Sequence, residues 1–276
     1  MLTGGMYSVD SHQNRSRFAL IRSLASSLLF MVLVASTGHA QQNPPPAPPQ
    51  IDPKAQALLD RTIQALGGPA FLAFKTMTTR GRFFAIQEGV TAGMAPFESA
   101  VEFPDKRHYL YGEKGKKPVT LVNDGDRNWE LDKMGRTFQP PEQVRRWKLS
   151  MRYGLENLLR LRIHEPGVLI QAGGTDFVDN VPTLALDIFE AGGAQIKLLL
   201  HRQTYLPIRI SYRVQDPKTL EWDEYFDVYG DYQRFQGVNT PLHISRFVNG
   251  ERVSETIRNT AQYDEVYPEG YFGPPS

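Results

Sequence analysis

The sequence has no cysteine among its 276 residues. Disulfide bonds and thiolate metal ligands are therefore excluded, and so is a lipid-modified cysteine after a signal-peptide cleavage site. A strong charge of either sign is also missing, because 31 basic residues nearly balance 30 acidic ones. This balance argues against a nucleic-acid-binding protein, which needs a basic surface. Stability must come from a hydrophobic core, for which a composition of 41% hydrophobic residues is sufficient.

Recognisable catalytic motifs are missing as well. The six histidines stand singly, without the HxxxH or HExxH spacing of a zinc hydrolase. No GxSxG sequence is present to position a serine nucleophile, and the Gly-Gly pairs do not form a GxGxxG dinucleotide fingerprint. The sequence therefore predicts no catalytic residue, no metal site and no cofactor. A site assembled from distant residues stays open as the alternative.

The densest acidic group lies in a segment with strand composition and contains Asp223, Glu224, Asp227 and Asp231. Calcium would require carboxylates that converge from a loop, whereas a straight strand spreads them along one side. We therefore expect the three aspartates on the solvent side, where they keep the strand soluble and discourage edge pairing.

The N-terminus predicts export. Residues 23–35 form an apolar run that is preceded by Arg15, Arg17 and Arg22. Small residues follow, so residues 1–40 are expected to form a signal peptide that is cleaved between Ala40 and Gln41. The apolar run is shorter than the roughly 20 residues of a transmembrane helix, and an uncleaved anchor is the alternative. The mature protein is then periplasmic or secreted.

The remaining chain predicts a linker and one domain. Residues 41–50 (QQNPPPAPPQ) form a proline-rich linker, and residues 51–276 form a single half-barrel domain. Asp52-Pro53 opens an amphipathic helix that ends at Gly67-Gly68. Residues 141–163 predict one bent helix, or two helices broken near Gly154. Residues 87–96 are expected to form a loop.

Most other segments have strand composition. Four consecutive strands between Tyr205 and Phe272 are predicted to form an antiparallel meander, with Asn249-Gly250 as a tight hairpin turn. The predicted fold class is α+β and mostly antiparallel. We expect a strongly curved, incomplete β-barrel of about ten strands, wrapped over two or three helices.

Alternation along the last strands predicts one apolar face. This face is either an ordinary filled core or, if the few helices leave part of the concavity of so large a sheet unfilled, the lining of an apolar pocket; both alternatives stay open at this point. The expected lining residues are Leu206, Ile208, Ile210, Tyr212, Trp222, Phe226, Val228, Leu242 and Ile244. Tyr232 is assigned to the same face as Phe226.

The opening and closing segments carry a characteristic order of turns and strands. It comprises a helix ending in ALGG, a strand KTMTTRG, the segment Tyr225 to Tyr232, Gly237-Val238 with Pro241, the turn Asn249-Gly250, and Phe272. This order resembles the periplasmic outer-membrane lipoprotein-sorting (Lol-type carrier) superfamily. The resemblance implies an incomplete antiparallel barrel closed by helices, with a hydrophobic cavity that receives acyl chains in the carriers. It carries over no individual binding residue.

We therefore expect an exported, non-enzymatic protein that binds or carries lipids or lipid-modified proteins in a hydrophobic cavity. Two alternatives stay open: a non-catalytic interaction module that binds another cell-envelope protein, and a hydrolase with an unrecognised site. A carrier predicts an apolar cavity, a module predicts an exposed apolar patch, and an enzyme predicts a cleft with convergent polar groups of shifted pKa. Neither nucleic acid nor a stable membrane span after signal cleavage is expected.

Overall fold

The structure, a computed structural model, describes residues 47–112 and 118–275. The predicted signal peptide, its cleavage point at Ala40 and Gln41, and residues 41–46 of the predicted linker lie outside these residues. Gln50, the last residue of the predicted linker, belongs to a short strand, β1 (Gln50–Ile51). This strand pairs in parallel with β8 (Leu169–Val178), so the folded unit includes the end of the proline-rich segment.

The first helix follows the prediction. α1 (Pro53–Leu66) begins where an oxygen of the Asp52 carboxylate accepts a hydrogen bond from the Lys54 backbone N–H at 2.8 Å. It ends at Gly67, whose φ of 131° favours glycine. A Cβ atom at Gly67 would lie 2.4 Å from the Gly237 carbonyl oxygen, so the end of α1 packs closely on the turn before strand β13 (Val238–Val248).

Three further helices lie in the described part of the chain: α2 (Pro69–Ala73), α3 (Pro141–Arg152) and α4 (Leu155–Arg160). The predicted helical segment at 141–163 is thus two helices rather than one bent helix. Gly154, with extended φ and ψ of −61° and 150°, separates them. None of the described helices is long and apolar enough to span a membrane.

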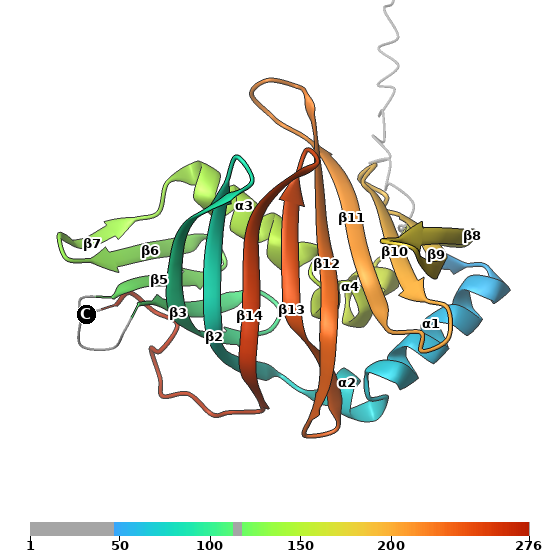
Figure 1. The fold of residues 1–276 in the computed structure, drawn as a ribbon, viewed down its shortest axis with the longest axis horizontal. Coiled ribbons are helices and arrows are strands. Elements are labelled where there is room, and N and C mark those ends of the chain that lie inside the picture. Colours follow the sequence, from blue (N-terminus) through green and yellow to red (C-terminus); the bar gives the residue numbers. More distant parts are fainter. Residues whose placement is uncertain (1–46, 113–117, 276) are drawn as a thin grey trace, which may run out of the picture. The chain divides into compact units, whose positions relative to one another are not determined.

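The described strands form one sheet. Besides β1 and β8 it contains β2 (Thr76–Gln87), β3 (Val90–Glu102), β4 (Lys106–Tyr111), β5 (Val119–Asp124), β6 (Arg127–Asp132), β7 (Gly135–Phe138), β9 (Val181–Phe189), β10 (Gln195–His201), β11 (Pro207–Gln215), β12 (Trp222–Phe235), β13 (Val238–Val248) and β14 (Glu251–Tyr263). The order is β1-β8-β9-β10-β11-β12-β13-β14-β2-β3-β4-β5-β6-β7. Strands β1 and β7 are its edges, so the sheet is not closed. Figure 1 shows α3 and α4 behind its central strands. We call that side the helix-facing side and the opposite side the outer side.

The predicted architecture is confirmed in its coarse form: a mostly antiparallel, curved and unclosed sheet with few helices. The number of strands is fourteen rather than about ten in the described residues. Residues 87–96 also differ from the prediction, because the expected loop contains only a tight turn and then the start of β3. Glu88 and Gly89, with φ of 51° and 77°, turn the chain tightly into a hairpin with β2. Proline has no backbone N–H to donate to a neighbouring strand. Pro96 is tolerated because the pairing of β3 with β4 ends at Phe97, so no such donor is required at Pro96.

The C-terminal meander is confirmed. Strands β11 to β14 pair consecutively and antiparallel. The turn between β13 and β14 is Asn249-Gly250, and both residues have the positive φ, 51° and 83°, that the sequence predicted.

The predicted faces of β12 are wrong. Tyr225 and Tyr229 join the main core on the helix-facing side, and Asp227 shares their side. Phe226 therefore lies on the outer side, where its ring stacks on Phe247 at 4.4 Å between centroids. The prediction put the aspartates in solvent, but the residue directly opposite Asp227 in β13 is Arg246, which neutralises it.

Tyr232 also departs from the predicted face. Asp231, with a φ of 53°, interrupts the regular strand geometry. After this point Tyr232 packs against the main core instead of continuing on the side of Phe226. Its hydroxyl donates to the Pro207 carbonyl oxygen at 2.8 Å and ties β12 to β11.

The main core packs α1, α2 and α4 against strands β8 to β14 and extends to Met77 of β2. Its fully buried members are mostly aliphatic and include Leu59, Leu66, Leu158, Leu159, Ile170, Leu186, Ile188, Ile196 and Leu198. A separate, aromatic cluster of Phe97, Tyr109 and Leu121 lies on β3 to β5. Most of the main core thus lies over β8 to β12, and the part of the sheet around β3 to β5 is packed differently.

Candidate functional site

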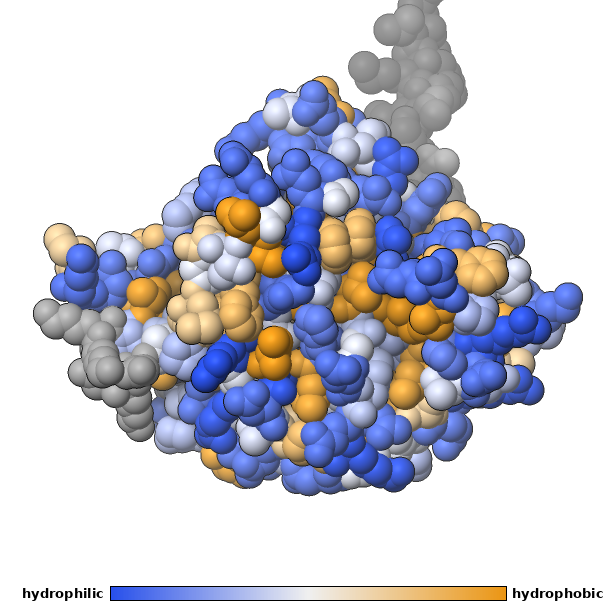
Figure 2. All heavy atoms as spheres, viewed as in Figure 1, coloured by the Kyte–Doolittle hydropathy of each residue, from blue (hydrophilic) through white to orange (hydrophobic). Residues whose placement is uncertain are grey.

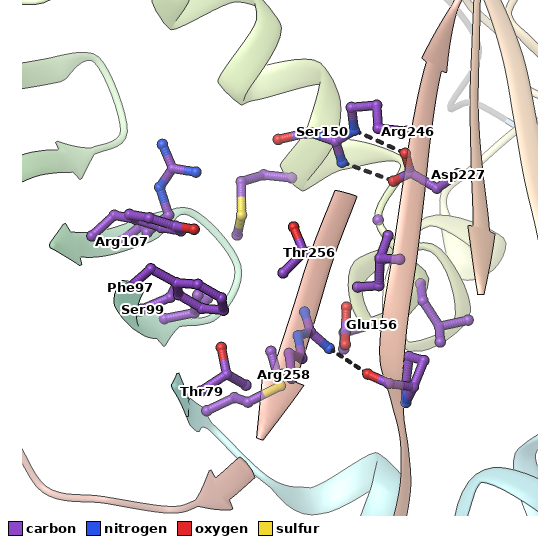
Figure 3. Close-up of a pocket in the computed structure, with 18 of the residues that line it drawn as sticks. Thr79, Phe97, Ser99, Arg107, Ser150, Glu156, Asp227, Arg246, Thr256 and Arg258 are labelled. Carbon is purple, nitrogen blue, oxygen red and sulfur yellow. Dashed lines mark hydrogen bonds and ion pairs between the residues drawn. The ribbon is translucent and has the colours of Figure 1, made fainter. Parts of the chain in front are cut away.

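A cavity of about 200 Å³ lies on the helix-facing side, between the sheet and helices α3 and α4. Strands β2, β3, β4, β12, β13 and β14 supply its walls, and the break at Gly154 forms part of its rim. Figure 3 shows the labelled side chains that surround it. This volume is below the roughly 300 Å³ at which pockets for drug-sized ligands begin, so the cavity can hold only a small or slender group.

The apolar wall of the cavity is largely aromatic. Phe97 and Tyr109 stack at 5.3 Å between centroids, and Tyr111 packs against Tyr109 at 4.2 Å. Phe83 meets Tyr111 edge to face at 5.5 Å. Burial raises the pKa of the Tyr109 hydroxyl well above its usual value, so this hydroxyl stays neutral.

Three arginines reach the cavity from different strands (Figure 3): Arg107 from β4, Arg246 from β13 and Arg258 from β14. Each sits where the strand alternation places it on the helix-facing side. The lining carboxylates are Asp227 and Glu156. Three positive side chains against two negative ones leave the described lining with an excess of one positive charge.

Arg246 and Asp227 form a bidentate pair across β12 and β13. The two bonds, Nε to Oδ1 and Nη2 to Oδ2, both measure 2.8 Å. The neighbouring Asp227 carboxylate raises the pKa of Arg246 above its usual value. This pair engages both oxygens of Asp227, and neither Arg107 nor Arg258 lies within 4 Å of this carboxylate.

Arg107 is held by a polar network behind the cavity wall. Its Nε and Nη2 donate to Asn123 Oδ1 at 3.1 and 3.0 Å. Asn123 is fully buried and donates in turn to Asn128 and Gln139 at 2.7 and 3.0 Å. No carboxylate of the described residues lies within 4 Å of the Arg107 guanidinium. Burial lowers the pKa of Arg107 from its usual value, which shows how unfavourable an unpaired charge is here.

Arg258 is also short of acceptors. Its Nη1 donates to the Pro241 carbonyl oxygen at 3.2 Å, and its buried Nε has no partner among the described residues. Glu156 lines the same cavity, yet no described basic group lies within 4 Å of its carboxylate. The guanidinium of Arg258 therefore keeps hydrogen-bond donors for a ligand.

A second cavity of about 330 Å³ continues the space under α3. Arg246 and Ser150 line both cavities. Tyr212, Tyr225 and Val248 add apolar surface to the second one. The helix-facing side therefore carries two cavities that share Arg246 and Ser150 as lining residues.

The nine predicted lining residues are dispersed. Ile210 and Tyr212 are buried in the main core, and Leu206 packs against it. Ile244 lines the first cavity and Tyr212 the second. Ile208 lies at a β-bulge and packs against a separate cluster that contains Leu199. Whether any of the nine contacts a ligand stays a prediction.

The other four residues lie away from these two cavities. Trp222 is 53% exposed, with the Arg213 guanidinium 5.8 Å from its ring. Phe226 and Val228 are half-buried on the outer side, and Leu242 is half-buried outside the described buried clusters. Figure 2 views the outer side and shows apolar residues there in small groups between polar ones.

Sequence reasoning missed the three arginines. Arg246 alternates with Ile244 and Val248, so it occupies an apolar-face position, and this was the available signal. A charged residue at such a position is either paired or functional. Arg107 carried no comparable signal, because its partner Asn123 lies 16 residues further along the chain.

Comparison with known proteins gives no sequence match: no family model matches the chain, and no curated protein matches it. Solved structures do match. A DUF1329 family protein from Desulfovibrio piger aligns with a TM-score of 0.53 and 10% identity over 79% of this chain and 96% of that one.

Two further structures are similar. An outer-membrane lipoprotein-sorting protein domain from Vibrio parahaemolyticus gives a TM-score of 0.47 and 8% identity, over 79% and 97% of the two chains. A LolA superfamily protein from Nitrosomonas europaea gives 0.48 and 11%, over 79% and 96%. At these identities the likeness concerns the fold alone.

Proposed function

We propose that this chain is an exported, non-enzymatic protein that binds lipids or lipid-modified proteins, with the periplasm or the exterior as its location. The observation that carries the proposal is the cavity between the sheet and α3–α4, which has an aromatic wall and lies beside a second cavity. A slender amphiphilic ligand fits a small space with both apolar and charged walls.

The chemistry of the lining favours binding over catalysis. No histidine lines the cavity among the described residues. The hydroxyl of Ser150 donates to the Trp147 carbonyl oxygen of its own helix at 2.7 Å, and Asp227 is held by Arg246. Neither group forms a nucleophile paired with a general base. The described residues also contain no cluster of metal-ligating side chains.

The surface favours a lipid ligand over a purely protein-binding module. Exposed large apolar side chains are spread over separate hairpins, including Met94, Phe138, Phe177, Leu220 and Trp222. A docking module would gather such residues into one contiguous patch.

Extraction of the natively purified protein with organic solvent, followed by mass spectrometry, tests the proposal. We expect a stoichiometric co-purified amphiphile, and displacement of a fluorescent fatty acid by added lipid. A protein that releases no lipid and binds no fatty-acid probe would contradict the proposal.

A further inference from the structure

We propose that the cavity of about 200 Å³ binds the neutral vicinal diol of a single-chain amphiphile, such as an alkyl glycerol. The residues that would bind the diol are Thr79, Ser99, Glu156 and Arg258, which we call the polar end of the cavity. The inference rests on the lipid-binding function proposed above and specifies the headgroup of the ligand.

The polar end is brought together by the neighbouring strands β14, β2 and β3 and by α4. Thr79 of β2 lies directly opposite Ser99 of β3, and the Cβ atoms of such a pair are about 4.5–5.5 Å apart. Arg258 of β14 lies opposite Gly81, which adds no side chain between Arg258 and Thr79. Figure 3 shows the Thr79 hydroxyl, Arg258 and Glu156 around the same end of the cavity.

Glu156 and Arg258 face one space without forming an ion pair, because their carboxylate and guanidinium are more than 4 Å apart. Burial is the main reason that the pKa of the Tyr263 hydroxyl rises to about 12, and Glu156 also raises this pKa whereas Arg258 lowers it. Both charges therefore act on the same neighbouring hydroxyl. A ligand group between them can donate a hydrogen bond to Glu156 and accept one from Arg258.

The two hydroxyls of the polar end are buried without a partner. Thr79 is 2% exposed and Ser99 is 8% exposed, and neither side chain forms a hydrogen bond with another described residue. The buried Nε of Arg258 also has no acceptor among the described residues. Buried polar groups are nearly always satisfied, so these donors and acceptors indicate a polar ligand at this end of the cavity.

A diol matches this mixture of groups better than an anion does. Each hydroxyl of a diol both donates and accepts, so it can bind a carboxylate, a guanidinium and further hydroxyls together. A carboxylate or phosphate only accepts, and it would bring its negative charge beside Glu156. The aromatic wall of Phe97 and Tyr111 is then left for the hydrocarbon chain, and the small volume suits a single chain.

Isothermal titration calorimetry on the wild-type protein tests the headgroup directly. The ligands are octyl glyceryl ether, the same compound with both hydroxyls methylated, and octanoate, each used below its micellar concentration. We expect the diol to bind about tenfold more tightly than the methylated compound, which keeps the oxygens and lacks the two O–H donors. The diol should also bind more tightly than octanoate. Equal affinity for the diol and the methylated compound, or tighter binding of octanoate, would overturn the inference.

Free glycerol distinguishes an amphiphile from a small polyol. Because the chain contributes apolar contacts, glycerol at the same concentration should not compete with octyl glyceryl ether. Competition at that concentration would show that the ligand is a free polyol and would overturn the assignment to an amphiphile.

Two conservative variants assign the polar end. Thr79→Val keeps the size of a side chain whose hydroxyl has no partner, and it should reduce the preference for the diol about threefold or more. Glu156→Gln keeps the shape but weakens the acceptor, and should reduce this preference as well. The matched controls are Glu98→Gln, at a carboxylate that pairs with Arg80 at 2.9 Å, and Thr260→Val, at an exposed threonine. Both controls should bind all ligands like wild type, and an unchanged preference in folded Thr79→Val and Glu156→Gln would contradict the assignment.

Two outcomes separate this inference from the proposed function. If the methylated compound binds as tightly as the diol, the headgroup inference is wrong while lipid binding stands. If neither of these compounds nor octanoate binds, both are wrong. The comparison on the wild-type protein requires no variant, so a variant that fails to fold does not affect it.

Discussion

The two halves of the helix-facing side are built from one sheet and packed in opposite ways. Over β8 to β12, leucines from α1 and α4 reach the strands, and residues such as Leu59, Leu158 and Leu186 are fully buried. Over β2 to β4 and β12 to β14, α3 contributes a single buried side chain, Trp147. The strands there carry arginines and aromatic residues around a cavity. The comparison indicates that the positions of the helices, rather than the sheet, determine where a cavity remains on the helix-facing side.

The largest expected effect is a difference in unfolding free energy between alanine substitutions of two isoleucines, one in each half of the helix-facing side. Ile210 is 1% exposed in the filled half, so Ile210→Ala should lower the free energy of unfolding by about 2–5 kcal/mol. Ile244 already borders the cavity, so Ile244→Ala should cost only about 1 kcal/mol. Urea melts of both variants measure the difference. Equal losses would mean that both halves are packed alike.

The next largest expected effect on stability concerns the ion pair between Asp227 and Arg246, the arginine that lines both cavities. Asp227→Ala leaves Arg246 without its partner on the helix-facing side. Because the Arg246 side chain is 39% exposed, solvent reduces the loss of unfolding free energy to about 2 kcal/mol. Asp231→Asn in the same strand is the control, since that side chain is 79% exposed and asparagine tolerates the φ of 53° at this position, so its effect should stay within about 0.5 kcal/mol. Similar losses for both variants in urea melts would contradict the assigned role of the pair.

The outer side should affect stability without affecting ligands. Phe226→Ala removes the stack on Phe247 and should cost about 1–2 kcal/mol in urea melts. Displacement of a fluorescent fatty acid should be unchanged, because Phe226 lies on the side away from the cavities. Weakened binding in this folded variant would place the ligand on the outer side.

The smallest expected effect is a dependence of thermal stability on pH, which arises from the Asp52 carboxyl. The N–H groups of Ala172 and Lys54, at 2.9 and 2.8 Å, hold the pKa of the Asp52 carboxyl below its usual 3.8. A lowered folded pKa stabilises the fold above the unfolded pKa, and this contribution is lost as the pH falls through the folded pKa. The Tm difference between wild type and Asp52→Asn should therefore be constant near neutral pH and shrink below about pH 4. A Tm difference that grows as the pH falls would contradict the assignment of the Asp52 carboxylate as the cap of α1.

Much of the fold could be predicted from the sequence, because its signals are local. Asp52-Pro53, Gly154 and Asn249-Gly250 each set a helix or turn boundary through their own backbone preferences. Local sequence does not determine which face of the sheet a polar strand residue occupies. The orientation of Asp227 depends on Arg246, which lies 19 residues away and is brought opposite only by the pairing of β12 with β13.

The cavity was predicted only as a class of site. Alternation indicated a wide apolar face with few helices to cover it, but the face that it assigned to β12 is the outer one. The predicted lining set contained Ile244 but none of the arginines, because a search for apolar residues passes over charged ones on the same side. The position of Arg107 also depends on the buried Asn123–Gln139 contact, which no sequence motif marks.

The central claim, that the cavity between the sheet and α3–α4 holds the ligand, is tested most directly by two threonines of β14. Thr256 lines the cavity, whereas Thr260 is exposed on the same strand. Thr256→Phe should fill the space and abolish binding of a fluorescent fatty acid, and Thr260→Phe should bind it like wild type. Both variants are checked for folding by urea melts. Unchanged binding in folded Thr256→Phe would contradict the account.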